Sequence, residues 1–224
     1  MTYNILNGLE LLYPGSIIPQ LKRTLDNFSE SEIPMQDAFS LGQLKSKLWL
    51  IENLPENLGT VFICAGWYGT LAALMFERAR SKFDKIRSFD IDSSCAPVAD
   101  TMNRPWVIDG WKFKASTLDI LEMNYPTTYV TYRANGTSLE LTEIPNTIIN
   151  TSCEHIVNFD QWYNKIPQGM LLVLQSNDYD KIQEHVNCSK NLEEFSKSTP
   201  MSKVLYEGEL ELEKYTRFMK IGYR

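Results

Sequence analysis

Apolar residues follow two different spacings along the chain. Spacings of three and four residues predict amphipathic helices over 17–28 and 38–51. Short apolar runs bounded by glycine, proline or polar residues predict buried strands over 61–65, 86–92, 111–115, 147–150 and 170–175. Helical segments are predicted between several of these runs, over 71–80, 96–102 and 159–166. Strands that alternate with helices predict a mostly parallel sheet with helices on both faces.

Two segments break the parallel pattern. Asn135-Gly136 lies between two β-prone runs and predicts an inserted β-hairpin over about 127–145. The β-prone segments 204–212 and 216–223 are only a few residues apart, so they predict an antiparallel hairpin at one edge of the sheet. We expect a single α/β domain, with residues 1–58 as an N-terminal helical cap and residues 59–224 as the core.

The first predicted strand leads into a turn rich in small residues, Ala65-Gly66-Trp67-Tyr68-Gly69. The helix that follows such a turn directs its free N–H groups at a ligand. Asp90, at the end of the second strand, follows Gly69 by 21 residues, and an acid at this spacing can bind a ribose hydroxyl. The pattern indicates a pocket for a nucleotide-like cofactor, with a purely structural strand-to-helix turn as the alternative.

Composition limits the classes of binding partner and the expected cellular compartment. The 224 residues are 43% hydrophobic, which is enough for one substantial core. A formal net charge of −6 argues against nucleic acid as a partner, because an extended nucleic-acid surface needs clustered lysine and arginine. No apolar run reaches the roughly 18 to 20 residues of a membrane span, and no secretory leader is recognisable. We therefore expect no membrane partner and a cytoplasmic location.

The cysteines predict neither disulfides nor a metal site. Cys64, Cys95, Cys153 and Cys188 are scattered, without CxxC spacing or a neighbouring pair of histidines. We expect reduced thiols at all four positions and no bound metal. Cys153 is expected to be a buried thiol without a catalytic role.

The order of elements over residues 59–224 resembles that of the class I S-adenosylmethionine-dependent methyltransferases. The turn at 65–69 is similar to the glycine-rich first motif of that family, and residues 89–92 are similar to its ribose-binding second motif. The resemblance implies a Rossmann-like, doubly wound seven-stranded sheet, mostly parallel, with an antiparallel C-terminal hairpin. It also implies S-adenosyl-L-methionine as the cofactor, bound by Ala65, Gly66, Trp67, Tyr68, Gly69, Asp90 and Ile91.

The resemblance adds two further segments to the site. Residues 117–119 occupy the place of the family's third motif, which surrounds the adenine with Thr117, Leu118 and Asp119. Residues 150–155 occupy the place of the fourth motif, near the transferred methyl group. This position implies both cofactor contact by Asn150 and a catalytic role for Asn150, Glu154 and His155.

The catalytic candidates have distinct expected roles. His155 is suited to act as a general base because the pKa of imidazole lies near neutrality, with Asn150 and Glu154 orienting the acceptor. Glu154 would accept a cationic or hydroxyl group of the substrate. The alternative is that Ser152 and Glu154 only begin a helix, with His155 at the surface.

Other residues have weaker assignments. We expect Trp67 and Tyr68 to wall the pocket, and the N-terminal helices and the inserted hairpin to form the walls of the acceptor site. His185 and Asn177 follow the fifth strand and are weaker site candidates. Arg217 is expected to be a solvated strand residue.

Three features depart from the family pattern. Phe62 replaces the usual acid of the first motif, and Cys64 replaces its first glycine. The amino group of the cofactor is thereby left without its usual partner. Residues 150–153 also lack the Asn/Asp-Pro-Pro-aromatic form that methylates nucleobase amines, so such amines are not the expected acceptor.

We therefore predict an S-adenosylmethionine-dependent methyltransferase that acts on a small polar metabolite, and the sequence allows a homo-oligomer. One alternative is an NAD(P)-dependent oxidoreductase with a Rossmann fold. The turn at 65–69 lacks G-x-G-x-x-G and the chain ends in a predicted hairpin, which both argue against that class. A second alternative is a catalytically degenerate protein that keeps the methyltransferase fold as a binding protein.

Overall fold

Seven strands form the central sheet of the computed structural model, which describes residues 2–29 and 33–224. The strands lie in the order β3-β2-β1-β6-β7-β9-β8. Strands β3 to β7 of this order pair in parallel, whereas β9 pairs antiparallel with both β7 and β8. The predicted sheet, including its antiparallel C-terminal hairpin, is confirmed. The strands are β1 Gly59–Cys64, β2 Phe83–Asp90, β3 Phe113–Thr117, β6 Thr147–Asn150, β7 Leu171–Asn177, β8 Lys203–Glu211 and β9 Thr216–Tyr223.

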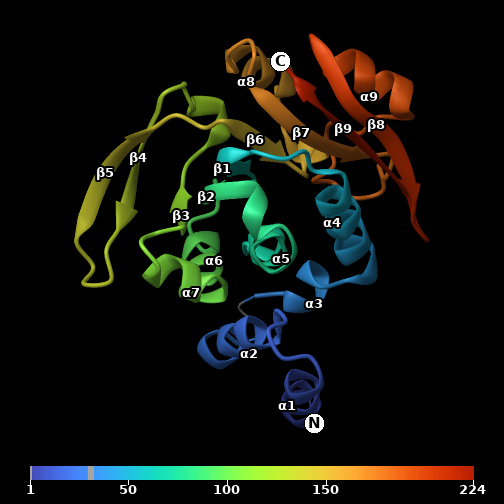
Figure 1. Ribbon diagram of the computed structural model, residues 1–224. Coiled ribbons are helices and arrows are strands. Elements are labelled where there is room, and N and C mark those ends of the chain that lie inside the picture. The colour runs from blue at the N-terminus through green and yellow to red at the C-terminus, as the bar shows by residue number, and fades with distance from the viewer. Residues whose placement is uncertain (1, 30–32) are drawn as a thin grey trace.

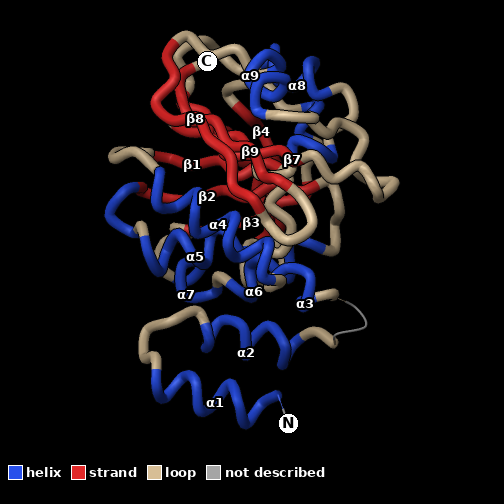
Figure 2. Tube along the Cα trace, turned by 90° about the vertical axis from the view of Figure 1, so that its right-hand side faces the viewer, coloured by secondary structure: helices blue, strands red, loops and turns tan. Residues whose placement is uncertain are grey.

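Helices cover both faces of this sheet (Figure 1). One face packs against α4 (Leu41–Asn53), α5 (Thr70–Arg78), α6 (Cys95–Met102) and α7 (Arg104–Ile108). The other face packs against α8 (Phe159–Lys165) and α9 (Leu192–Ser198). An outer layer beyond α5 and α6 consists of α1 (Thr2–Leu12) and α2 (Ile18–Asn27) (Figure 2), and α3 (Met35–Ala38) lies between this layer and α4 (Figure 1). Among the described residues, none of the helices combines the length and the apolar character that crossing a membrane requires.

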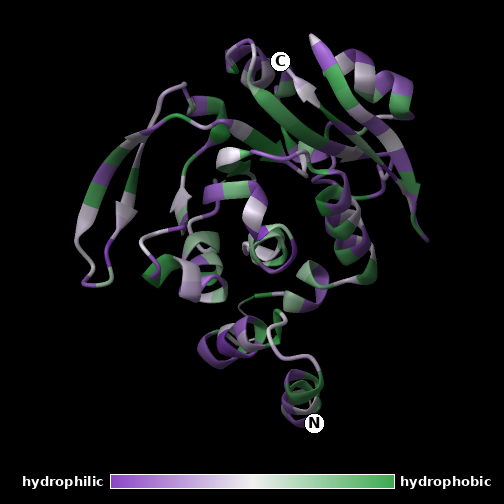
Figure 3. Cartoon of the chain, in the orientation of Figure 1, coloured by the Kyte–Doolittle hydropathy of each residue, from purple (hydrophilic) through white to green (hydrophobic). Residues whose placement is uncertain are grey.

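The two faces of the sheet receive alternate side chains of each strand. Val61 and Ile63 of β1 pack towards α4 and α5, whereas Phe62 and Cys64 pack towards α8. The ring of Phe62 meets that of Phe89 edge-on, with centroids 5.0 Å apart. Hydrophobic residues accordingly gather along the central strands (Figure 3). The two positions that depart from the methyltransferase pattern, Phe62 and Cys64, are therefore part of the α8-side core.

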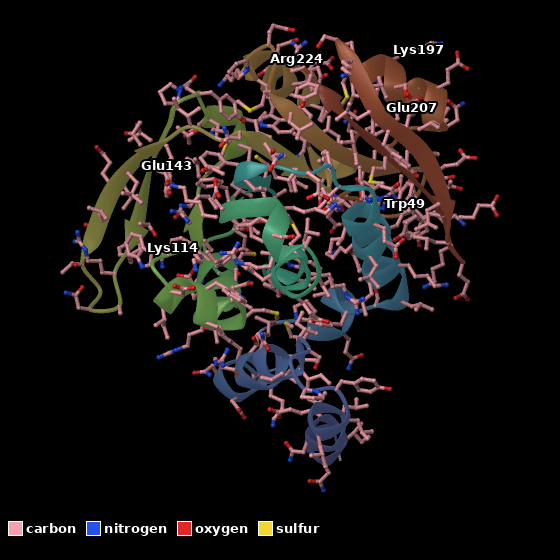
Figure 4. The ribbon with its side chains drawn as sticks, in the orientation of Figure 1. Trp49, Lys114, Glu143, Lys197, Glu207 and Arg224 are labelled. Carbon is pink, nitrogen blue, oxygen red and sulfur yellow. The ribbon has the colours of Figure 1, made fainter. Side chains whose placement is uncertain are left out.

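The inserted hairpin forms a separate two-stranded sheet beside β3, from β4 (Thr127–Tyr132) and β5 (Ser138–Glu143). Arg87 of β2 anchors it, since its Nε donates to the hydroxyl of Tyr129 at 3.0 Å and to the carboxylate of Glu143 at 2.7 Å. Glu143 and Lys114 lie on the opposite side of the molecule from Trp49 of α4 (Figure 4). The hairpin is thus fixed at the β3 edge of the sheet.

Close packing against α6 explains why glycine occupies position 69 in the turn after β1. Its φ is +72°, and a Cβ there would lie 2.7 Å from Asn103 Nδ2 and 3.0 Å from Ala99 Cβ. Asn103 Nδ2 also donates to the carbonyl of Gly69 at 3.1 Å. The close approach of α6 therefore requires a residue without a side chain at this position.

Gly69→Ala is expected to lower the free energy of unfolding by about 2 to 4 kcal/mol. A left-handed backbone costs an alanine about 1 kcal/mol, and the contact with α6 adds an overpacking cost of about 1 to 3 kcal/mol. Gly136→Ala is the matched control, because Gly136 also has a positive φ, +80°, but a Cβ there meets nothing within 4 Å. Urea unfolding of both variants tests the prediction, and equal losses of stability would contradict the packing role of Gly69.

Candidate active site

The carboxyl ends of the parallel strands meet at one edge of the sheet, where open α/β sheets bind their ligands. Cys64, the last residue of β1, is paired with Asn150, the last residue of β6. Because β9 runs in the opposite direction, its first residues lie at this same edge, with Arg217 paired to Asn177 of β7. The register therefore brings the predicted cofactor turn, the segment after β6 and the start of β9 together.

The turn after β1 has a strained backbone that neighbouring groups hold in place. Ala65 and Trp67 have φ values of 54° and 48°, in the left-handed region that non-glycine residues avoid. Gly66 N donates to the carbonyl of Phe89 at 2.9 Å. A Cβ on Gly66 would lie 2.0 Å from Ser88 Oγ. The turn thus lies directly against the end of β2.

The carboxylate of Asp90 accepts two backbone hydrogen bonds, one of them from this turn. Its Oδ2 accepts from Trp67 N at 2.8 Å, and its Oδ1 accepts from Asp92 N at 3.1 Å. Burial raises the pKa of Asp90, and these backbone donors oppose the rise. Each carboxylate oxygen has a second lone pair. Asp90 can therefore position the turn and still accept a hydrogen bond from a ligand.

The segment after β3 lies beside Asp90. Leu118 N donates to the carbonyl of Asp90 at 2.9 Å. Thr117 is exposed, Leu118 and Asp119 are half-buried, and Asp119 Oδ1 accepts from Leu121 N at 2.8 Å. The side chain of Ile91 is 69% exposed. The structure thus places the residues predicted to surround the adenine next to the residue predicted to bind the ribose.

A cavity of about 530 Å³ opens beside Trp67 of the turn. Its size suits a small ligand. Trp67 lines it, together with Glu154, His155, Asn177, His185 and Arg217, and so does part of the segment 37–45. The inserted hairpin lines a separate cavity of about 870 Å³ with Arg87 and Lys114, at the β3 edge. The inserted hairpin therefore does not line the cavity beside Trp67, because its anchor to β2 holds it at the β3 edge of the sheet.

Trp67 and Tyr68 have different environments although their rings stack, with centroids 4.7 Å apart. Trp67 lines the cavity. Tyr68 is only 5% exposed and packs in a core cluster with Met35 and Val98. The expectation that both rings wall the pocket is wrong for Tyr68, because its ring lies in that core cluster with the ring of Trp67 stacked on it.

Glu154 and Arg217 form a buried ion pair at the cavity wall. Arg217 Nη1 lies 2.8 Å from Glu154 Oε1, with the two side chains 4% and 2% exposed. Asn177 Nδ2 donates to the same oxygen at 2.5 Å, and Arg217 Nη1 donates to the carbonyl of Thr151 at 3.1 Å. The expectation that Arg217 is solvated is wrong. Residue spacing along β9 does not reveal that an antiparallel neighbour places Arg217 against the segment after β6.

The two histidines of the chain meet beside this pair. The rings of His155 and His185 are perpendicular, with centroids 4.5 Å apart, although 30 residues separate them in the sequence. His185 Nδ1 lies within hydrogen-bond range of the carbonyl of Tyr179. His155 is exposed, as the alternative of a surface histidine expected, and partial desolvation at the cavity wall lowers its pKa against the opposing carboxylate of Glu154. His185 and Asn177, the weaker candidates from the sequence, thus lie in the same cavity as His155.

Lys47 is a buried charge close to the same pair. Its side chain lies on α4, the residue is 7% exposed, and its Nζ donates to the amide oxygen of Gln43. Burial lowers the pKa of Lys47 to about 7, with a further lowering by Arg217 and an opposing effect of Glu154. A lysine in an amphipathic helix is ordinarily a surface residue, so the sequence carries no signal for this position.

Asn150 and Cys153 complete the segment after β6. Asn150 Oδ1 accepts from Ser152 N at 2.8 Å, and its buried Nδ2 has no hydrogen-bond partner among the described residues. Cys153 is buried, and burial raises the pKa of its thiol well above the ordinary value. Cys153 therefore has the environment of a buried thiol, whereas Asn150 offers a free donor.

Comparison with known proteins identifies the fold. No protein-family model matches the chain, and no curated protein matches it in sequence. In structure it is similar to the N-methyltransferase NodS from Bradyrhizobium japonicum WM9 in complex with S-adenosyl-L-homocysteine, with a TM-score of 0.55, 10% identity, and coverage of 89% of this chain and 98% of that one. It is also similar to geranyl diphosphate methyltransferase in complex with SAM (TM-score 0.54, 12% identity, coverage 88% and 91%).

A third similar structure is the small RNA methyltransferase HEN1, with a TM-score of 0.57 and 14% identity. The match covers 82% of this chain and 25% of that chain. Together these similarities show the class I S-adenosylmethionine-dependent methyltransferase fold. Two of these names give an acceptor, geranyl diphosphate and small RNA, and the two differ in kind.

Arg217→Met is expected to lower the free energy of unfolding by about 3 to 5 kcal/mol, because it leaves the carboxylate of Glu154 buried without a counter-charge. The double variant Arg217→Met/Glu154→Gln is the control, since it removes both charges. We expect it to be more stable than Arg217→Met alone. Urea unfolding of the three proteins measures the difference, and a double variant no more stable than the single one would contradict a buried pair.

Lys47→Met is expected to stabilise the protein by about 1 to 3 kcal/mol near pH 7, with a smaller gain as the pH rises towards 10.5. Between these values the unfolded chain binds a proton at Lys47 that the folded chain does not, so the stability of the wild type rises with pH in this window. Thermal unfolding across the window measures the gain. Lys45→Met, at an exposed position of the same helix, should show no such pH dependence. A pH-independent gain for Lys47→Met would exclude the lowered pKa.

Proposed function

We propose that the protein is an S-adenosylmethionine-dependent methyltransferase with a small polar acceptor. The proposal rests on the strained turn at 65–69. The carboxylate of Asp90 binds this turn through Trp67 N, and a cavity opens beside Trp67. The fold shared with NodS, which was solved with S-adenosyl-L-homocysteine, and with geranyl diphosphate methyltransferase, which was solved with SAM, supports the cofactor. The proposed location of the enzyme is the cytoplasm.

The cofactor would lie along the carboxyl ends of β1, β2 and β3. Asp90 would accept from the ribose, and Thr117, Leu118 and Asp119 would surround the base. The turn would contribute Ala65, Gly66, Trp67 and Gly69, with Tyr68 offering only its backbone because its side chain is buried. The free amide donor of Asn150 suits the carboxylate at the amino-acid end of the cofactor. Phe62 and Cys64 point into the core and can supply no contact there.

When bound, S-adenosyl-L-methionine supplies an electrophilic methyl group on its sulfonium. The work of the protein in an in-line displacement is chiefly to align the acceptor and exclude water. Trp67 belongs to the turn and also lines the cavity, so its ring would shield the cofactor and the acceptor from solvent. Asn150 would orient the acceptor, and the imidazole of His155, which lines the cavity and is open to solvent, is suited to take its proton.

The ion pair in the cavity wall favours a hydroxylated acceptor over a cationic one. Arg217 already neutralises Glu154, so an ammonium group would not find an unpaired carboxylate charge. The net charge of −6 disfavours a nucleic-acid acceptor, which would require clustered lysine and arginine. A small metabolite with hydroxyl groups therefore remains the acceptor class that the site supports best.

Asp90→Asn is expected to weaken the binding of S-adenosyl-L-homocysteine at least about tenfold, because a hydrogen bond to a charged carboxylate contributes about 1.5 to 3 kcal/mol. Calorimetric titration measures the affinity, and circular dichroism checks that the fold is retained. Asp92→Asn is the matched control. Asp92 lies two residues away and is exposed, and its Oδ1 accepts from Ser94 N, which an asparagine can still do. Equal affinities for the two variants would remove Asp90 from the cofactor site.

A further inference from the structure

Three side chains from two loops meet at one wall of the cavity. Glu154 and His155 belong to the 3-10 turn Cys153–His155 after β6, and His185 belongs to the loop after β7. One carboxylate oxygen of Glu154 and one ring nitrogen of each histidine all lie within 4.8 Å of one another. Ligand atoms around one cation lie about 3 to 4 Å apart, given metal–ligand distances of about 2.0 to 2.2 Å. Small side-chain rotations would therefore close this set around an ion.

One carboxylate oxygen of Glu154 is buried without a hydrogen-bond partner among the described residues, which independently points to a ligand. The side chain of Glu154 is 2% exposed, and its Oε1 accepts from both Asn177 and Arg217. Its Oε2 is equally buried but has no hydrogen-bond partner in the described part of the chain. Leaving a buried charged acceptor unsatisfied costs at least about 1 to 3 kcal/mol. A cation beside Oε2 would satisfy this oxygen.

Both histidines are oriented as metal-binding histidines usually are. A ligating imidazole typically donates its second ring N–H to a carbonyl or carboxylate, which fixes the tautomer and frees the other nitrogen. His185 Nδ1 lies against the carbonyl of Tyr179, and the backbone of Glu184 lies beside the ring of His155. Each ring can therefore present one unprotonated nitrogen to an ion.

We propose that Glu154, His155 and His185 bind a divalent transition-metal cation whose open coordination positions face the acceptor cavity. Two imidazoles and one carboxylate suit manganese, iron, cobalt or zinc, whereas magnesium and calcium prefer an all-oxygen set. The charge of Arg217 beside the same carboxylate opposes a dication, as it opposes an ammonium group, but a metal ion also gains the two imidazole nitrogens as ligands, so we expect moderate, micromolar affinity.

The role of the cation rests on the proposed methyltransferase function. A hydroxyl bound to a divalent cation loses its proton far more readily, as bound water does. The O–H bond of the acceptor would break with release of the proton to solvent. An O–C bond would then form as the methyl–sulfur bond breaks, and its electron pair would convert the sulfonium to a neutral thioether. In this scheme His155 is a ligand of the cation and not the general base.

Cobalt(II) tests the site without any measurement of activity. Untagged, EDTA-treated protein is titrated with cobalt(II) and followed by visible absorption, and S-adenosyl-L-homocysteine affinity is measured separately by calorimetry. We expect one equivalent per chain and at least about a tenfold loss of cobalt affinity in His155→Ala and in His185→Ala. Asp180→Asn, at an exposed acid in the same loop as His185, is the control and should retain wild-type affinity.

The outcomes separate the metal site from the proposed function. Absence of cobalt binding in the wild type, or wild-type affinity in both histidine variants, would overturn the metal site whatever the calorimetry shows. Loss of affinity in the histidine variants with unchanged thermal unfolding and unchanged S-adenosyl-L-homocysteine affinity would support it. A wild-type protein that binds cobalt but not S-adenosyl-L-homocysteine would refute the methyltransferase function and leave the metal site standing.

The open coordination positions are tested with manganese(II). A manganese ion that keeps exchangeable water raises the relaxation rate of water protons, and we expect this enhancement in the wild type and not in His185→Ala. A bound ion without enhancement would mean that the protein fills its coordination sphere, which would overturn the proposed contact with an acceptor.

Discussion

Burial of the Glu154 carboxylate determines how the segments around the cavity beside Trp67 pack together. A charge with 2% exposure needs a counter-charge, and the antiparallel direction of β9 supplies it by placing Arg217 opposite Asn177 at the carboxyl edge of the sheet. The pair joins three chain segments that are far apart in sequence: the 3-10 turn after β6, the end of β7 and the start of β9. It also fixes the turn that carries His155. With Oε1 shared between Asn177 and Arg217, Oε2 is the oxygen through which this network can bind an ion.

The proposed cofactor site depends on a different feature, the turn at 65–69 with its strained backbone. Glycine at 66 and 69 allows close packing against Ser88 and α6, so these residues serve the fold whether or not a ligand is bound. Asp90 likewise holds the turn while keeping lone pairs for a hydroxyl. Phe62 and Cys64 belong to the α8-side core, which explains how a first motif without its acid remains compatible with the fold. In the proposed site, Asn150 and the backbone of the turn are the groups left to contact the amino-acid end of the cofactor.

Sequence patterns predicted the sheet well because buried strands of an α/β fold are local features. The predicted segments 147–150 and 216–223 coincide with β6 and β9. Short helices without a clear hydrophobic period, such as α7 and α9, were not predicted. Trp111 was predicted to lie in a strand, but it has a φ of 56° and precedes β3. In the site, residues adjacent to a motif were predictable, including Asp90 and Glu154. Arg217, Lys47 and the contact of His155 with His185 depend on strand register and helix packing, which spacing along one segment does not encode.

We infer that the carboxyl edge of the sheet binds S-adenosyl-L-methionine and not a nicotinamide cofactor. Calorimetric titration of the wild-type protein with S-adenosyl-L-methionine, and separately with NADH, distinguishes the two. We predict one binding site per chain for S-adenosyl-L-methionine and no heat of binding for NADH. Binding of NADH alone would indicate a Rossmann oxidoreductase, and binding of neither would indicate a degenerate methyltransferase fold. Either result would contradict the claim.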